Sequence, residues 1–209
     1  MPRVSRQQAD SNRLTIKSVS SRLLRERGIK GVSVSDLMAA AGLTHGGFYG
    51  HFHSKDALVA EACAAAFEGS VERWNKRVAV APDRVAARTA LLDAYLSDAA
   101  RRSPGTSCPA AALVGDIARE APEAPVRSAY VAGLEALLPI LSAVQTAAEP
   151  GERRRHALAD FSMMVGGLLL ARATAGHGIS DDFLAAAREG LIAPPERARR
   201  RKVLPPARG

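Results

Sequence analysis

The apolar residues near the N-terminus recur every three or four positions, which is the spacing of one face of an α-helix. We therefore predict a first helix over about residues 13–27. The buried face of this helix is expected to contain Ile16, Val19, Leu23 and Leu24. Gly28 follows an arginine-rich last turn and is placed to end the helix.

Polar residues that start helices divide the next segment into short pieces. Ser33 and Asp36 have the spacing of a capping box, so we predict that a second helix begins there and ends at Gly42. Thr44 is placed to cap a third helix, and Ser54 to cap a fourth. The fourth helix keeps helical spacing of its apolar residues for several turns. The chain therefore begins with three short helices followed by a long one.

The rest of the chain consists of amphipathic stretches separated by proline and glycine. We predict helices over about residues 84–102, 110–120, 123–147, 152–175 and 181–192. Hydrophobic residues make up 47% of the chain and aromatic residues only 4%, a balance that favours helices over sheet. We expect an all-α protein of roughly nine helices. Its predicted parts are an N-terminal arm and three-helix head (1–54), a larger helical body (55–193) and a tail (194–209).

The net charge of +8 is concentrated at the two ends of the chain. Residues 1–60 carry nine basic and four acidic side chains, residues 61–193 carry fourteen and sixteen, and residues 194–209 carry six and one. A basic head on a near-neutral body indicates a polyanionic partner for the head. The last segment combines prolines with a basic run, so we predict that the tail is disordered.

Two cysteines, Cys63 and Cys108, are too few and too far apart in sequence for a disulfide framework or a zinc site. We therefore expect a cytoplasmic protein with no metal and no other cofactor. The N-terminus lacks the apolar core of a signal peptide. The longest apolar run, residues 163–171, is well short of the roughly 20 residues that span a membrane, so we expect no membrane partner.

Residues 32–58 contain a capped short helix, a glycine turn, a second short helix and the start of a long one. This is the geometry of a helix-turn-helix, whose second helix enters the major groove of DNA while the first braces it. The stretch resembles the DNA-binding domain of TetR-family regulators of the TetR/AcrR type. The residues that match are Gly42, Leu43, Thr44, His45, Gly46, Phe48, Tyr49, His51, Phe52 and Lys55. The motif resemblance covers about residues 13–61, and beyond them it rests on the number and length of the helices.

The resemblance implies which residues contact DNA. Ser35, His45 and Gly47 correspond to positions that face bases. The positions that correspond to phosphate contacts are Thr44, Tyr49, His51 and Lys55, and the predicted set also includes Ser33 and Gly46. Many relatives carry a side chain at the positions of Gly47 and Gly50. We therefore expect few direct base contacts from this helix, and we expect His45, backbone amides and DNA shape to contribute more to sequence recognition.

Three of these residues have simpler interpretations that the sequence leaves open. Tyr49 is alternatively a half-buried ring packed on the third helix. His51 is alternatively a structural histidine with a hydrogen bond inside the head. Lys55 is alternatively a solvated residue, although a cation at a helix N-terminus is unfavourable unless an anion binds there.

The resemblance also implies a homodimer in which the last two long helices of each subunit form a four-helix interface. The predicted interface residues are Phe161, Met164, Val165, Leu168, Leu169, Phe183, Leu184, Ala187 and Leu191, and the alternative is that they form an ordinary intrachain core. Gly166 and Gly167 would allow close helix approach. A pocket for an apolar ligand is predicted in the body, lined by Trp74, Tyr95, Cys108, Tyr130 and Met163, although core packing explains the aromatic residues and Met163 equally well.

Cys108 begins a predicted helix after Arg101 and Arg102. A helix N-terminus and nearby cations lower the pKa of a thiol, so a redox or electrophile sensor is one interpretation of this residue. Cys63 lies inside an alanine-rich helix and is expected to be a small buried hydrophobe.

The function expected from the sequence is that of a ligand-responsive transcriptional regulator, most simply a repressor. It would bind double-stranded, pseudo-palindromic operator DNA as a dimer and leave it when a small apolar molecule or a stress signal acts on the body. An enzyme is the first alternative, but the chain contains no nucleophile elbow, metal-ligand spacing or phosphate-binding loop. The second alternative is a sequence-independent nucleic-acid binder that uses the basic head and tail.

Overall fold

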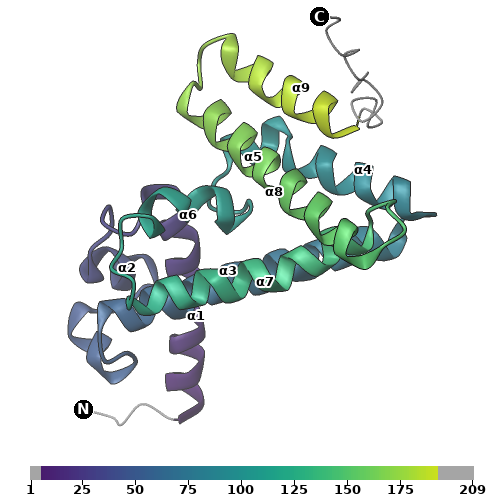
Figure 1. The fold of residues 1–209 in the computed structure, drawn as a ribbon. Helices are drawn as coiled ribbons and strands as arrows, with labels where there is room; N and C mark the ends of the chain where they lie inside the picture. The colour runs from purple at the N-terminus through teal and green to yellow at the C-terminus, as the bar shows by residue number, and fades with distance from the viewer. Residues whose placement is uncertain (1–5, 193–209) are drawn as a thin grey trace, which may run out of the picture.

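The computed structural model describes residues 6–192, and all regular elements in this range are helical (Figure 1). The all-α prediction is therefore confirmed. The elements are α1 (Arg6–Arg27), α2 (Val34–Ala40), the 3-10 helix η1 (His45–Gly50), α3 (Lys55–Val80), α4 (Arg84–Tyr95), α5 (Asp98–Arg102), α6 (Pro109–Ile117), α7 (Pro125–Ala143), α8 (Pro150–Ala173) and α9 (Ile179–Ile192).

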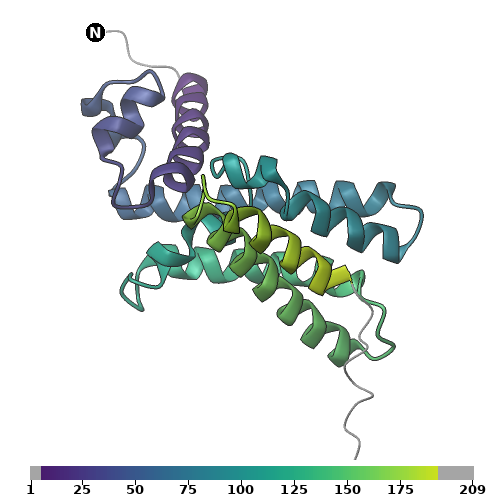
Figure 2. The ribbon, with the colours of Figure 1, turned by 90° about the horizontal axis from the view of Figure 1, so that it is seen from above.

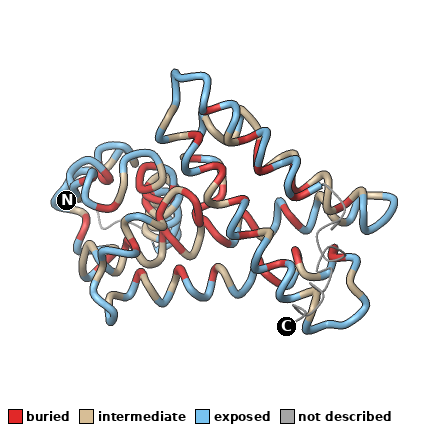
Figure 3. Tube along the Cα trace, turned by 45° about the horizontal axis from the view of Figure 1, so that its top comes forward, coloured by how far each residue is buried: buried red, intermediate tan, exposed pale blue. Residues whose placement is uncertain are grey.

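Two long helices, α3 and α7, lie side by side and form the axis of the molecule (Figures 1 and 2). The helices α1, α2 and η1 gather at the end where α3 begins. The helices α8 and α9 pack against each other over the other part of α7 and α4. Buried residues lie where the helices face one another (Figure 3) and form one contiguous core from Ile16 to Leu191. The predicted division into a head and a body stays a prediction, and the predicted tail lies outside the described residues.

The first helix and the stretch over residues 84–102 differ from the prediction in extent. The first helix begins at Arg6, seven residues before the predicted start. The stretch predicted as one helix over 84–102 is divided into α4 and α5. Ser97 causes the division, because its hydroxyl accepts a hydrogen bond from the Ala100 amide at 3.1 Å and caps a new helix.

Among the described residues, α7 is long and apolar enough to cross a membrane by length and composition alone. It packs along α3 and α8 within the fold. One of its faces is buried through Leu137, Leu138 and Leu141, and Glu135 on another face is exposed. We therefore interpret α7 as a core helix.

Candidate functional site

The first turn of α2 is held by the predicted capping box. The Ser33 hydroxyl accepts a hydrogen bond from the Asp36 amide at 3.1 Å, and the Asp36 carboxylate accepts one from the Ser33 amide at 2.8 Å. The Ser33 hydroxyl also donates to the Asp36 carboxylate at 2.6 Å, and this bond, followed by the one from the Ser33 amide, lowers the pKa of Asp36 below its usual value. Gly42 follows α2 with a φ of +72°, a conformation that favours glycine, and turns the chain toward η1. The start and end of this helix are as predicted.

The second helix of the motif differs from the prediction, because residues 45–50 form a 3-10 helix. Thr44 stands at its N-cap position, but its side chain makes no capping hydrogen bond. Phe48 is buried and stacks against Phe52, with 6.0 Å between the ring centroids. A methyl group added at Gly46 or Gly50 would meet no atom within 4 Å. The segment is therefore anchored by Phe48 and open to solvent at its glycines.

Most residues of the predicted DNA-contacting set are accessible in the structure. The exposed members are Ser33, Ser35, Thr44, His45, Gly46 and Tyr49, whereas Gly47, His51 and Lys55 are partly buried. The Tyr49 ring is 73% exposed and touches Phe48 edge-on, so the interpretation as a half-buried ring is wrong. Within residues 6–192, the His51 imidazole makes no hydrogen bond. The His51 backbone carbonyl accepts a hydrogen bond from Arg13 on α1. The set thus forms a polar surface on α2 and η1.

Lys55 has partners inside the protein. Its ammonium donates hydrogen bonds to the backbone carbonyls of Ile29 at 3.1 Å and Val32 at 2.6 Å. Both carbonyls belong to the turn between α1 and α2, so the first residue of α3 closes this turn. The interpretation of Lys55 as a merely solvated residue is therefore wrong, and its predicted phosphate contact has to compete with these two bonds.

A second tie within the head involves Arg13, which the sequence analysis did not single out. Its guanidinium lies over the Phe52 ring, 4.2 Å from the centroid. It also donates to the His51 carbonyl and forms an ion pair with Glu61 on α3. The helix α1 is thereby fastened to both η1 and α3. The only sequence signal was an arginine on the first helix, because its partners lie 38 and 48 residues away.

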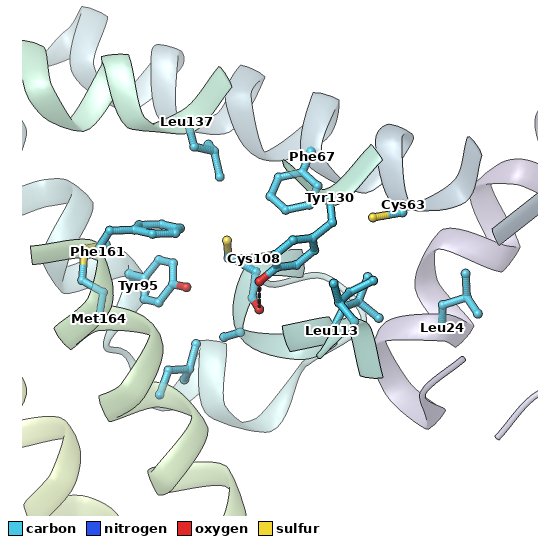
Figure 4. Close-up of a cluster of buried hydrophobic side chains, with 14 of the residues drawn as sticks. Leu24, Cys63, Phe67, Tyr95, Cys108, Leu113, Tyr130, Leu137, Phe161 and Met164 are labelled. Carbon is cyan, nitrogen blue, oxygen red and sulfur yellow. Dashed lines mark hydrogen bonds between the residues drawn. The ribbon is translucent and has the colours of Figure 1, made fainter. Parts of the chain in front are cut away.

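The body contains a cavity of about 300 Å³ between α3, α4, α5, the loop before α6 and one residue of α8. Three of the five predicted pocket residues line it, namely Trp74, Tyr95 and Cys108. Tyr130 instead packs edge-on against Phe67 and donates from its hydroxyl to the Ala110 carbonyl at 2.9 Å (Figure 4). Met163 is 44% exposed on α8, and its sulfur lies beside Gly190 of α9. The assignment of these last two residues to the pocket was wrong, because helix periodicity does not show which neighbour each face meets.

The environment of Cys108 is opposite to the one predicted. The thiol lies between Tyr95 and Tyr130 in the core, and burial raises its pKa above the usual value (Figure 4). The Tyr95 hydroxyl and the Ala110 and Ala111 amides act in the other direction but are outweighed. Cys63 is buried as predicted, and burial raises its pKa to about 12. Both thiols are therefore protonated near neutral pH.

The predicted dimer residues lie largely inside the single chain, which corrects the prediction. Six of them are buried in its own core, namely Phe161, Met164, Leu168, Leu184, Ala187 and Leu191. Val165 and Phe183 are partly buried, and Leu169 is 40% exposed. A methyl group at Gly167 would lie 2.7 Å from the Ala187 Cβ, so this glycine brings α8 close to α9 of the same chain. Gly166 faces open space.

Apolar side chains also cover the outer side of α8. The exposed members are Leu158, Met163, Leu169 and Leu170, and each is between 40% and 46% exposed. The helix is thus apolar on both sides, so its sequence pattern could not tell which side faces the core of the chain. We call these four residues and Gly166 the outer α8 face.

Two structural links join the head to the cavity, and a third joins it to α6, the helix that follows the cavity wall. The helix α3 begins at Lys55 in the head and lines the cavity with Ser70, Arg73, Trp74 and Arg77. Arg25 on α1 donates to the carbonyl of Ser107, a cavity residue, at 2.7 Å. The Asp116 carboxylate on α6 accepts a hydrogen bond from the Ile29 amide at 3.1 Å. The last two links join segments more than 80 residues apart, and no local pattern indicates them.

Comparisons with known proteins agree with this arrangement. Residues 16–62 match the family model of bacterial regulatory proteins of the tetR family. A stretch of 61 residues, 29% of the chain, is 36% identical to the HTH-type transcriptional regulator AcrR of Shigella flexneri and spans 28% of that protein.

Solved structures extend the likeness to the rest of the chain at the level of the fold. A TetR-family regulator from Cytophaga hutchinsonii superposes with a TM-score of 0.73 at 18% identity, covering 91% of this chain and 96% of that one. A TetR transcriptional regulator from Chloroflexus aurantiacus superposes with a TM-score of 0.71 at 24% identity, covering 89% and 94%. Residues 16–62 of this chain thus form a domain of the tetR family of bacterial regulatory proteins, and most of the chain shares the fold of TetR-family regulators.

Proposed function

We propose that the protein is a cytoplasmic, dimeric, ligand-responsive repressor, which binds a pseudo-palindromic operator and leaves it when a small molecule enters the body. It acts by binding and carries out no catalysis. The observation that carries the proposal is the course of α3, which closes the turn before α2 with Lys55 and lines the cavity nineteen residues later with Trp74. One rigid element thus connects a DNA-facing surface with a ligand-sized space.

The DNA-contacting part of the proposal rests on the polar surface of α2 and η1. Tyr49 and Thr44 are exposed at the two ends of η1 and suit phosphate oxygens. His45 and Ser35 are the exposed side chains placed to reach base edges. Lys55 has a positioning role in this proposal, because its ammonium holds the turn that carries α2.

The dimer part of the proposal rests on the outer α8 face. Apolar side chains on a second side of a helix favour a partner that covers them, and here the chain itself covers only one side of α8. A second copy of the chain is the proposed cover, with α8 and α9 of each subunit forming four helices around a two-fold axis. The interface proposed from the structure therefore keeps Leu169 of the residues predicted from the sequence and adds Leu158, Met163 and Leu170.

Ligand and DNA are coupled in this proposal through a change in the spacing of the two heads. A ligand that displaces α3 at Trp74 or the loop at Ser107 moves the head, because Arg25 and Asp116 tie α1 to the same region. If ligand and operator prefer different spacings, each weakens the binding of the other by the same factor. Two heads on a two-fold body read two half-sites, separated by about one DNA turn of 34 to 36 Å or a small multiple of it.

Genome-wide recovery of bound DNA followed by footprinting tests this proposal. We expect a protected site with two-fold symmetry that is bound poorly once one half is scrambled. Tyr49→Ala should weaken operator binding with unchanged helicity, whereas Val85→Ala on α4, which is also exposed and far from the head, should bind normally. A protected site without two-fold symmetry, or equal binding after scrambling, would contradict the dimeric repressor.

Sequence-independent binding to nucleic acid is the second candidate. The observation that favours it is the glycine content of η1, where Gly46, Gly47 and Gly50 offer no side chain to a base. An excess of unrelated competitor DNA distinguishes the two candidates, because a charge-only binder loses its complex and a repressor keeps it.

A further inference from the structure

The body cavity is positively charged on one side. Arg73 and Arg77 on α3 line it, and no aspartate or glutamate is among the described residues of its wall. Two further arginines lie behind the wall at the loop before α6. Arg25 donates to the Ser107 carbonyl, and Arg172 donates to the Ser107 hydroxyl and to the Ala100 carbonyl.

These guanidinium groups lack anionic partners inside the protein. Arg73 donates to the hydroxyl of Ser70 at 2.8 Å, and the partners of Arg25 and Arg172 are also neutral oxygens. Within residues 6–192, none of these three arginines forms an ion pair. Burial, followed by the charge of Arg73, lowers the pKa of Arg25 to about 10, and burial lowers the pKa of Arg73 and Arg172. An anion in the cavity would offset the repulsion between these arginines and their loss of hydration.

Polar atoms near the cavity also lack regular hydrogen bonds. The Tyr95 hydroxyl is fully buried, faces the Cys108 thiol and makes no hydrogen bond of normal geometry. The Nε of Arg172 is likewise buried without a partner. Arg172 stands one helical turn after Leu168, which lines the cavity. Buried polar atoms without partners are uncommon in native proteins and mark places where a ligand can bind.

The remaining wall has an apolar part and a hydroxyl-bearing part. Leu91, Leu168 and the rings of Trp74 and Tyr95 form the apolar part, and the two rings meet edge-on with 6.2 Å between centroids. The hydroxyl-bearing residues of the wall are Ser70, Ser97, Ser103, Thr106 and Ser107. A volume of about 300 Å³ lies at the small end of the range for ligand pockets. The cavity thus offers cations at one side, several hydroxyl groups and a small aromatic wall.

We propose that this cavity binds a small organic carboxylate with a compact aromatic or branched apolar body. Its carboxylate pairs with Arg73 and Arg77, and its body packs against Trp74, Leu91 and Leu168. The proposal replaces the purely apolar ligand expected from the sequence. Its regulatory meaning rests on the proposed function, since Arg73 and Arg77 belong to the helix that begins in the head.

Trp74 provides the readout, because it is the only tryptophan of the chain and lines the cavity. Benzoate and phenylacetate are titrated against the full-length protein, together with benzamide and phenylacetamide as neutral analogues of the same shape and with inorganic phosphate. Tryptophan fluorescence and the melting temperature are followed. Arg73→Gln and Arg77→Gln are compared with Lys76→Gln, which removes an exposed cation from the same helix outside the cavity wall.

We expect at least one carboxylate to change the fluorescence saturably and to bind at least about tenfold more tightly than its amide, the loss typical of one charge-assisted hydrogen bond. Either arginine variant should lose at least about tenfold in affinity for that carboxylate, and Lys76→Gln should lose none. Equal binding of carboxylate and amide, equal binding of phosphate, unchanged affinity in both arginine variants, or no binding of either carboxylate at millimolar concentration would each overturn the proposal.

A separate measurement distinguishes this proposal from the proposed function. Fluorescence anisotropy of a labelled operator fragment is followed while the bound carboxylate is added. Release of the fragment supports both proposals. Saturable binding at Trp74 with the operator still bound would contradict the ligand-responsive repressor and leave the carboxylate site standing.

Discussion

A charge on the outer α8 face tests the proposed dimer most directly. Leu170 is 46% exposed in the single chain, so the folded subunit accommodates a glutamate there in contact with water. In a dimer that covers this face, the carboxylate of Leu170→Glu loses its water in both subunits, because a two-fold interface contains each residue twice. The variant should therefore remain folded and lose the dimer.

The size of the effect follows from the burial of the side chain. Full burial of a leucine is worth about 1.5–3 kcal/mol, and the chain alone already buries about half of Leu170. The dimer interface thus gains about 1 kcal/mol per subunit from this residue. An unpaired carboxylate in its place adds a further cost of at least about 1 kcal/mol. Two copies bring the total to about 4 kcal/mol, which raises the dissociation constant of the dimer about a thousandfold.

Size-exclusion chromatography with light scattering measures the outcome, and thermal melting reports the fold. Val131→Glu is the matched control, because Val131 is 52% exposed on α7, away from the proposed interface, and this variant should stay dimeric. Leu168→Glu is the opposite control. Leu168 is 0% exposed inside the chain, so a glutamate there should cost more than about 4 kcal/mol and unfold the subunit.

The pattern across the three variants decides the question. A Leu170→Glu protein that stays dimeric with the parental dissociation constant would refute the outer α8 face as the interface. A Leu168→Glu protein of parental stability would refute the packing of α8 against its own chain.

Three further predictions concern the head, its link to the cavity and the buried thiols. Lys55→Ala should lower the free energy of unfolding by about 2 kcal/mol, since two backbone carbonyls lose a charged donor. Operator binding should weaken with an unchanged salt dependence, and a salt slope reduced by about one unit would assign Lys55 to a phosphate instead. Asp116→Ala leaves the Ile29 amide without its acceptor, so chemical denaturation should show a free energy of unfolding lower by about 1–2 kcal/mol. The ligand should also release the operator less effectively from this variant. Release equal to that of the parent protein would exclude this link between head and cavity. The thiol of Cys63 has a pKa of about 12 when folded against 9.0 for a free thiol, so only the unfolded chain ionises above pH 9.0. Stability should therefore fall there by about 1.4 kcal/mol per pH unit from this group, and a Cys63→Ala variant should lose less stability over the same pH range.

Local hydrogen bonds explain why much of the head could be predicted from the sequence. The capping box of Ser33 and Asp36 and the cap at Ser54 each join atoms three residues apart, so the sequence alone contains both partners. Gly42 adopts the positive φ that a turn after a helix requires. The spacing of apolar residues likewise indicated α3, α6 and α9 to within a few residues.

The glycines of the recognition segment limited the local prediction. A helical third segment was expected after Thr44, and the structure has a 3-10 helix whose N-cap side chain is unbonded. Glycine carries little preference for the α-helix, so three glycines in six residues leave the choice to the packing of Phe48 against its neighbours.

Only the tertiary structure decided which side of each body helix faces inward. The pattern of α8 is apolar on both sides, so periodicity could not separate Leu168 in the core from Leu170 on the surface. Contacts between distant segments were equally invisible, as with Arg25 and Ser107, which are 82 residues apart. A sequence pattern records how apolar each face is, and the identity of its neighbour depends on how all the helices pack at once. The family and its DNA-binding segment were thus indicated by local sequence, whereas the cavity wall, the outer α8 face and the ties between head and body were set by packing.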